Sequence, residues 1–254
     1  MRVRILFAKD PAVRFVSHLD LARAWERALR RSGMPLKLAG EFNPHPRLVF
    51  AAPLSVGTAG ERELLDIYLA EDMDLTALAE AIRRQLPPGL PLFGVRQVPE
   101  EEPALTANAN LAEYRWEPRG PSSLGTRAAG GTTGSEDVGL LREAVGAFLG
   151  ATSCQVQRQT KSGQIRTMDI RPLVTGLSVQ GAASGAGAGA NDDISAAVTF
   201  RVALGSEEAV RPGEVVIAMG SRLGRDFAPE AGLTTRGWLY HRDGERVEAL
   251  WPPV

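Results

Sequence analysis

The chain of 254 residues contains a single cysteine, Cys154, and only three histidines. One cysteine cannot form an internal disulfide, and its isolation excludes the cysteine-rich clusters that hold structural zinc or iron–sulfur groups. Histidine is too scarce to replace the missing thiolates at a closed metal site. We therefore expect no metal and no cofactor, with an open site made by His18, His45 and nearby carboxylates as the alternative.

Long apolar runs are also missing. No stretch approaches the roughly 18 apolar residues that a membrane-spanning helix needs. Residues 1–9 are too short and too charged to form the apolar centre of a signal peptide. We therefore expect a cytoplasmic protein with no membrane partner.

Several familiar functional motifs are absent. The sequence has no glycine-rich phosphate loop followed by lysine, no dinucleotide-binding fingerprint and no HExxH pattern. It also lacks the aromatic signature with which the sheet of an RRM reads RNA bases. No standard enzyme class is therefore indicated by a motif.

The near-zero net charge conceals an uneven distribution. The whole chain has 29 Lys and Arg against 30 Asp and Glu, a net charge of −1. Residues 1–60 hold ten of the basic residues and four of the acidic ones, an excess of +6, so the remainder carries −7. Segregated positive charge attracts anionic partners, of which nucleic acid is the common one. An ordinary solvated helix face is the alternative interpretation.

The first 100 residues predict the element order βαββαβ of a ferredoxin-like unit. Val3, Ile5 and Phe7 alternate with other residues, which is typical of a half-buried strand. Ser17 is a suitable N-cap for a helix that continues to about Ser32. The later elements are expected as strands at 36–38, 65–69 and 92–98, and as a helix that begins after Asp74.

A second, less regular copy of this order is expected in residues 111–254. Its clearest strand is 194–204, where apolar residues alternate strictly. Helices are expected after Ser135 and from Pro212, and a final strand near Trp238. The predicted fold is α+β, with tandem ferredoxin-like units at 1–100 and 111–254, a linker at 101–110, and Gly/Ala-rich loops at 118–134 and 181–193.

The predicted helix after Ser17 has two chemically different faces. On a helical wheel of about 100° per residue, its apolar residues fall on one side with His18 among them. The opposite side, near Asp20, carries guanidinium groups that can pair with phosphate or carboxylate. His18 lies in the first turn, where the helix dipole disfavours positive charge and should lower the pKa of the imidazole. A core histidine bonded to the backbone is the alternative. The arginines of the polar face are Arg23, Arg27, Arg30 and Arg31.

A second candidate segment is EFNPHPR at 41–47. Its two prolines restrict the backbone around His45. Asn43, His45 and Arg47 would then be held outward, and little conformational entropy would be lost when they bind a ligand. A structural turn is the alternative.

A third candidate segment, residues 161–172, adds Lys161, Arg166 and Arg171 to an otherwise acidic half of the chain. Asp169 and Arg171 are two residues apart, so in an extended strand they project to the same face. Mutual pairing of these two surface charges is the favoured interpretation.

These segments carry a family resemblance. RFVSHLDLAR at 14–23, FNPHPR at 42–47 with FAAPLSVG at 50–57, and DIRPLV at 169–174 resemble the radical-SAM-linked (radical SAM-associated) domain family of unknown function. The resemblance implies a partner, a radical SAM protein of the cobalamin-binding type, because family members are fused to such proteins or encoded beside them. It implies no reaction. The chain itself cannot be a radical SAM enzyme, since three cysteine thiolates hold that iron–sulfur cluster.

Together these features favour an accessory protein that binds an anionic substrate, with RNA as the expected one, and presents it to a radical SAM partner. On this interpretation the chain is not an enzyme on its own. One alternative is a metal-independent RNA endonuclease in which His18 and His45 transfer protons, an analogy of fold with CRISPR repeat-processing endonucleases. Another is a structural subunit without a ligand. The expected substrate-binding residues are Arg14, Ser17, Asp20, Arg23, Arg27, Arg30, Asn43, Arg47, Asp169 and Arg171.

Overall fold

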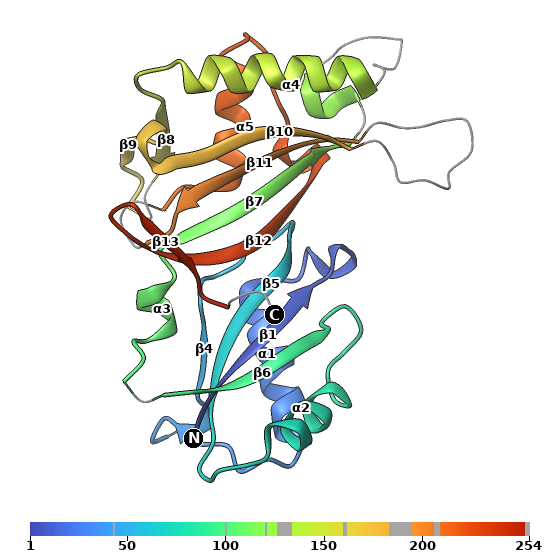
Figure 1. Cartoon of the computed structure of the whole chain (residues 1–254), viewed down its shortest axis with the longest axis vertical. Coiled ribbons are helices and arrows are strands. Elements are labelled where there is room, and N and C mark those ends of the chain that lie inside the picture. Colours follow the sequence, from blue (N-terminus) through green and yellow to red (C-terminus); the bar gives the residue numbers. More distant parts are fainter. Residues whose placement is uncertain are drawn as a thin grey trace, which may run out of the picture. The chain divides into compact units, whose positions relative to one another are not determined.

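The computed structural model describes residues 1–42, 44–99, 101–119, 121–125, 134–159, 162–182, 195–205 and 209–251 (Figure 1). The chain forms two compact units. Unit 1 consists of Met1–Leu111 and Thr235–Val254, and unit 2 of Ala112–Thr234. Residues 235–254 were predicted to belong to the second unit. The described residues among them group with the first unit instead, where Arg236 forms a buried ion pair with Glu63.

Unit 1 is built on one sheet with the strand order β12-β5-β1-β6, in which β4 also pairs with β5 and β13 with β12. Strand β1 is antiparallel to both β5 and β6. A separate short hairpin joins β2 to β3. The elements are β1 (Arg2–Lys9), α1 (His18–Arg31), β2 (Leu38–Ala39), β3 (His45–Pro46), β4 (Leu48–Phe50), β5 (Thr58–Tyr68), α2 (Leu75–Arg83), β6 (Leu92–Val98), α3 (Leu105–Asn108), β12 (Gly232–Asp243) and β13 (Arg246–Ala249).

Helices α1 and α2 pack on the face of this sheet that carries Val3, Ile5 and Phe7, and all three side chains are fully buried there. Trp25 of α1 meets Phe7 edge-on, with ring centroids 4.9 Å apart. The predicted caps are confirmed: Ser17 Oγ accepts from the Asp20 amide at 3.2 Å, and Asp74 Oδ1 accepts from the Ala77 amide at 2.8 Å. Periodicity and capping thus place α1 and α2 where the sequence predicts them.

The opposite face of β1 is not exposed, as a half-buried strand would require. Arg4 is fully buried, and its guanidinium donates to both carboxylate oxygens of Asp66 at 2.7 and 3.0 Å. Arg2 donates to the same carboxylate at 2.6 Å, and Arg4 also pairs with Glu102. Paired in this way, the cationic side chains can be covered by protein, so both faces of β1 lie inside unit 1.

A second buried ion pair joins the last long strand to β5. Arg236 Nε donates to Glu63 Oε1 at 2.8 Å, and both residues are almost completely buried. The same guanidinium donates to the carbonyls of Ala52 and Pro53, at 2.9 and 3.0 Å. At Gly60, an added Cβ would lie 2.6 Å from the Glu63 carboxylate, so glycine leaves room for the pair. The network ties β12, β5 and the loop after β4 together.

The strands of unit 2 are paired in the order β10-β11-β7, and β8 and β9 form a separate hairpin. Helix α4 packs on β10 and β11 and also contacts α5. The elements of unit 2 are β7 (Leu111–Pro118), α4 (Gly134–Leu149), β8 (Gln155–Gln159), β9 (Ile165–Asp169), β10 (Val174–Ala182), β11 (Ser195–Ala203) and α5 (Pro212–Ser221). Strand β10 was not predicted, because Gly176 and Gly181 interrupt its pattern.

The architecture is α+β, as predicted. No helix in the described parts of the chain is long and apolar enough to cross a membrane. Of the two predicted Gly/Ala-rich loops, residues 120, 126–133 and 183–193 lie outside the described residues. The predicted linker at 101–110 contains the short helix α3.

The Arg236–Glu63 pair provides a test of the packing in unit 1. Arg236→Met leaves the Glu63 carboxylate buried without its counter-charge, so the free energy of unfolding should fall by about 3–5 kcal/mol. Urea denaturation followed by circular dichroism measures it. The matched control is Arg246→Met, which removes an exposed pair with Glu248 and should cost less than about 1 kcal/mol. Equal effects of the two substitutions would contradict a stabilising role for the buried pair.

Candidate functional site

A pocket of about 560 Å³ in unit 1 lies between α1 and the chain from β2 to the loop after β4. Four residues selected from the sequence line it: His18, Arg23, His45 and Arg47. The two histidines therefore meet at one cavity, although they lie 27 positions apart in the sequence. Among the other residues that line the pocket are Leu19, Ala22, Glu26, Pro46, Leu48, Phe50 and Thr106.

The β2–β3 hairpin forms one wall of the pocket. His45 pairs in register with Ala39, and the Arg47 amide donates to the Lys37 carbonyl at 3.1 Å. Arg30, near the end of α1, donates to the Pro44 carbonyl at 2.9 Å and so links the helix to the hairpin. The wall is thus held by backbone pairing on one side and by α1 on the other, with His45 exposed.

His18 is the first residue of α1 and forms part of the pocket wall opposite the hairpin. Its ring meets Phe50 edge-on, with centroids 5.1 Å apart. Its Nδ1 is buried and has no hydrogen-bond partner among the described residues. Through this nitrogen, therefore, His18 makes no bond to the backbone of the described residues. Nε2 is left as the ring nitrogen that can meet a ligand.

The pKa of His18 is lowered. Burial is the largest cause, because it penalises the charged imidazolium, and the positive charges of Arg236 and Lys9 add to it while Glu63 opposes them. The sequence also predicts a lowered pKa for His18, but through the helix dipole, whereas the structure gives burial and the neighbouring charges as the causes. The lowered pKa leaves the ring neutral at pH 7.

Lys9 fixes the segment that leads into α1. Its ammonium group is buried and donates to the carbonyls of Arg14, Val16 and Thr58, at 2.7, 2.8 and 3.3 Å. Each of the three ammonium protons can thus meet an oxygen. The turn before Ser17, and with it the start of α1 at His18, is positioned by a buried charge.

The arginines of α1 lie on its exposed face. Arg23 pairs with Asp20 at 3.2 Å, and Ser17 donates to the same carboxylate at 2.7 Å. These contacts lower the pKa of Asp20, with the Ser17 hydrogen bond as the largest cause. Arg30 pairs with Glu26 at 3.0 Å. Arg27 is exposed and forms no ion pair within the described residues.

The positive surface of unit 1 is smaller than the count of charges predicts. Arg4 and Lys9 are buried, and Arg2 is largely covered by its pairing with Asp66. Arg47 stacks over Tyr68, with its guanidinium carbon 4.0 Å from the ring centroid. Arg14 lies over Phe15 at 4.3 Å and does not line the pocket. The charge available to a ligand at the pocket therefore comes mainly from Arg23, Arg47 and the neighbouring Arg27.

Asp169 and Arg171 lie in unit 2 and act locally. Asp169 Oδ1 accepts from the amides of Cys154 and Arg171 at 2.8 and 3.0 Å, and these bonds lower the pKa of the carboxyl. Arg171 donates to the Leu149 carbonyl at 2.9 Å. Asp169 thus holds a turn through backbone amides. The local hydrogen bonds of Asp169 and Arg171 account for the presence of both side chains without a ligand. The predicted site residue Asn43 lies outside the described residues.

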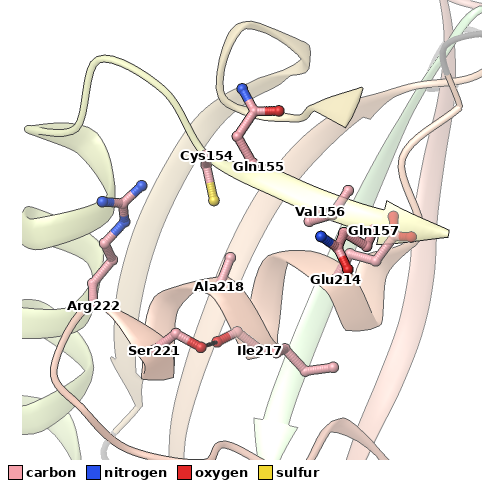
Figure 2. Close-up of a pocket in the computed structure, with 9 residues that line it drawn as sticks. All are labelled: Cys154, Gln155, Val156, Gln157, Glu214, Ile217, Ala218, Ser221 and Arg222. Carbon is pink, nitrogen blue, oxygen red and sulfur yellow. Dashed lines mark hydrogen bonds between the residues drawn. The ribbon is translucent and has the colours of Figure 1, made fainter. Parts of the chain in front are cut away.

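Unit 2 has a pocket of its own, of about 470 Å³, between β8 and α5 (Figure 2). Its charged residues are already engaged: Glu214 accepts from Arg158 at 2.6 Å, and Arg222 donates to the Ser153 carbonyl. Ser221 donates to the Ile217 carbonyl of its own helix at 2.9 Å, as Figure 2 shows. No residue selected from the sequence lines this pocket. In the parts of the chain that the structure describes, no group of three or more His, Cys, Asp or Glu could hold a metal ion.

Sequence reasoning missed several residues of the unit 1 site. Phe50 and Thr106 line the pocket. Lys9, Glu63 and Arg236 are buried charged residues that act electrostatically on His18. Phe50 belongs to a segment that the family resemblance already included, so that signal was available. Nothing local identifies Arg236, because its partner Glu63 is 173 positions away.

Comparison with known proteins assigns the chain to a family. Residues 2–212 match the family described as an uncharacterized protein conserved in bacteria (DUF2344), and the chain belongs to it. The match includes the whole 14–57 segment and the 169–174 segment. No curated protein matches the chain significantly.

The state of His18 can be measured directly. Its imidazole should titrate below the ordinary value of 6.5, because burial and the charges of Arg236 and Lys9 disfavour the imidazolium. NMR titration of the ring Cε1 proton, assigned with His18→Asn, measures the midpoint. A midpoint at or above 6.5 would contradict the burial described above.

The same titration affects stability. The unfolded chain binds a proton to this imidazole more readily than the folded protein does, so the free energy of unfolding should fall as the pH drops below 6.5. In His18→Asn this contribution should be absent, and the stability curve should be flatter between the two pKa values. Urea denaturation at several pH values checks it.

Proposed function

We propose that the protein is a radical-SAM-associated accessory protein that binds RNA at the unit 1 pocket and presents it to a radical SAM partner. The observation that carries the proposal is the gathering of His18, Arg23, His45 and Arg47 at one cavity. Guanidinium groups beside a concave surface suit phosphate, and a neutral imidazole suits a neighbouring hydrogen-bonding group.

The exposure of the α1 arginines supports this assignment. Arg23 is 66% exposed, and the ion pair with Asp20 that holds it is accessible to solvent. Such a pair is weak, so a phosphate can replace the carboxylate at little cost. Arg27 lies one turn further along the same face and adds a second charge.

The assignment of a radical SAM partner rests on the resemblance of the 14–23, 42–57 and 169–174 segments to the radical-SAM-linked family. Membership of DUF2344 is compatible with it, because the matched region includes these segments. Co-purification of the tagged protein from its native host, followed by identification of bound protein and RNA, tests the association.

The order of elements supports two ferredoxin-like units. Strand, helix, short hairpin, two strands, helix and strand follow one another in β1–α1–β2–β3–β4–β5–α2–β6. The same order recurs in β7–α4–β8–β9–β10–β11–α5–β12, whose last strand begins with residues 232–234 of unit 2 and continues with residues of unit 1. Each half then consists of the βαββαβ order with a hairpin inserted after its first helix. In unit 1 that inserted hairpin is the wall of the pocket.

RNA binding should depend steeply on salt. For single-stranded RNA the slope of log K against log salt should be about 0.7 per neutralised phosphate. Replacing both Arg23 and Arg27 by alanine should lower the slope by roughly 1.4 and weaken binding, which fluorescence anisotropy at several salt concentrations measures. Arg84→Ala, at the exposed end of α2, is the matched control and should change neither. Binding that does not respond to salt would exclude phosphate recognition.

A second candidate function is metal-independent RNA cleavage. Two observations favour it: His18 and His45 line one pocket, and burial lowers the pKa of His18, so that the neutral ring can accept a proton. In this case the arginines would hold the substrate while the histidines transfer protons to and from the reacting hydroxyl and leaving oxygen.

Incubation with total host RNA in the presence of a metal chelator separates the two functions. An accessory protein should leave the RNA intact, and this is the expected result. A nuclease would produce discrete ends, and His18→Ala or His45→Ala would reduce their formation by roughly 10²–10⁴-fold while circular dichroism shows an unchanged fold.

A further inference from the structure

The apolar part of the unit 1 pocket indicates more than phosphate binding. Ala22, Pro46, Leu48 and Phe50 contribute to its walls, and the neutral ring of His18 lies among them. Its volume of about 560 Å³ is within the range of about 300–1,000 Å³ typical of sites that enclose a small molecule. Contact with such apolar walls would not favour the binding of phosphate oxygens, whereas it would favour the binding of a flat apolar ring.

The hairpin that forms one side of the pocket carries a fully exposed aromatic residue. Phe42 is 100% exposed, between β2 and β3. Leu19 and Leu38, on α1 and β2, are 68% and 51% exposed. A fully exposed aromatic ring contributes nothing to the core of unit 1. On a segment of the chain that also carries Arg47, such a ring offers a face on which an unpaired base can stack.

We propose that this site recognises single-stranded RNA through its bases, with one unpaired base inserted in the pocket and a neighbouring base stacked on Phe42. This inference rests on the proposed function. A base in a duplex is stacked on both sides and paired at its edge, so it cannot enter a cavity between a helix and a hairpin. Arg23 and Arg47, which line the same pocket, then face the phosphates that flank the inserted base.

The polar groups available at the pocket fit the edge of a base. His18 Nε2 and Thr106 can donate or accept hydrogen bonds at the apolar walls, and the Glu26 carboxylate, whose Oε1 accepts from Arg30, can only accept. A base offers donors and acceptors on its edge and an apolar face, and it therefore uses both kinds of wall.

The test compares three fluorescently labelled probes with the full chain: a single-stranded RNA of roughly 12 nucleotides, its duplex, and the same strand with abasic riboses. The abasic strand retains every phosphate. We expect the intact single strand to bind about tenfold or more tightly than either of the others. Equal binding of intact and abasic strands would overturn base recognition while leaving the proposed function standing. No binding of any probe would overturn the proposed function and this inference together.

Two variants locate the recognition. Ala22→Leu adds bulk at the pocket wall, and Phe42→Ala removes a ring that supports no packing. Each should weaken binding of the intact strand by about tenfold and leave the abasic strand unaffected. Ala77→Leu, an exposed position of α2 outside the pocket, is the matched control and should change nothing. Unchanged discrimination in both Ala22→Leu and Phe42→Ala would overturn the assignment of this pocket.

Discussion

The buried pair of Arg236 and Glu63, with Lys9 beside it, is the constraint on which the unit 1 site depends. Burying three charged groups is costly, and it is tolerated only when hydrogen bonds satisfy them. Here the guanidinium meets the Glu63 carboxylate and two carbonyls, and the ammonium meets three carbonyls. Four of those carbonyls belong to the segments that precede α1 and follow β4, and the fifth belongs to Thr58 at the start of β5. The buried network of Arg236, Glu63 and Lys9 therefore helps to set the geometry of the unit 1 pocket.

The same charges act on His18 through space. Two cations beneath a partly buried imidazole oppose its protonation, and the single carboxylate of Glu63 only partly compensates. The helix dipole that sequence reasoning invokes would act in the same direction, but burial and the neighbouring cations are the causes that the structure identifies. A ring kept neutral in this way can serve recognition or proton transfer. The same placement of His18 therefore suits both the proposed accessory function and the nuclease alternative.

Local signals predicted the elements that depend on local physics. Ser17 and Asp74 cap the helices as expected, and the alternation of Val3, Ile5 and Phe7 identifies β1. Burial of the other face of β1 could not be predicted, because Arg4 becomes an interior residue only through Asp66 on a strand 62 positions away. The approach of His45 to His18 is equally non-local. Arg30 supports it by donating to the Pro44 carbonyl, a contact that the sequence spacing does not reveal.

The division of the chain between the two units has a consequence for biosynthesis. Glu63 and Lys9 are translated early, but Arg236 follows the whole of unit 2. Until Arg236 emerges from the ribosome, the Glu63 carboxylate has no guanidinium to pair with, and the loop at Ala52 and Pro53 lacks its two bonds. Domains usually fold in the order in which they are made. In this chain, unit 2 is complete before unit 1 can close its interior, so the unit 1 pocket is finished last.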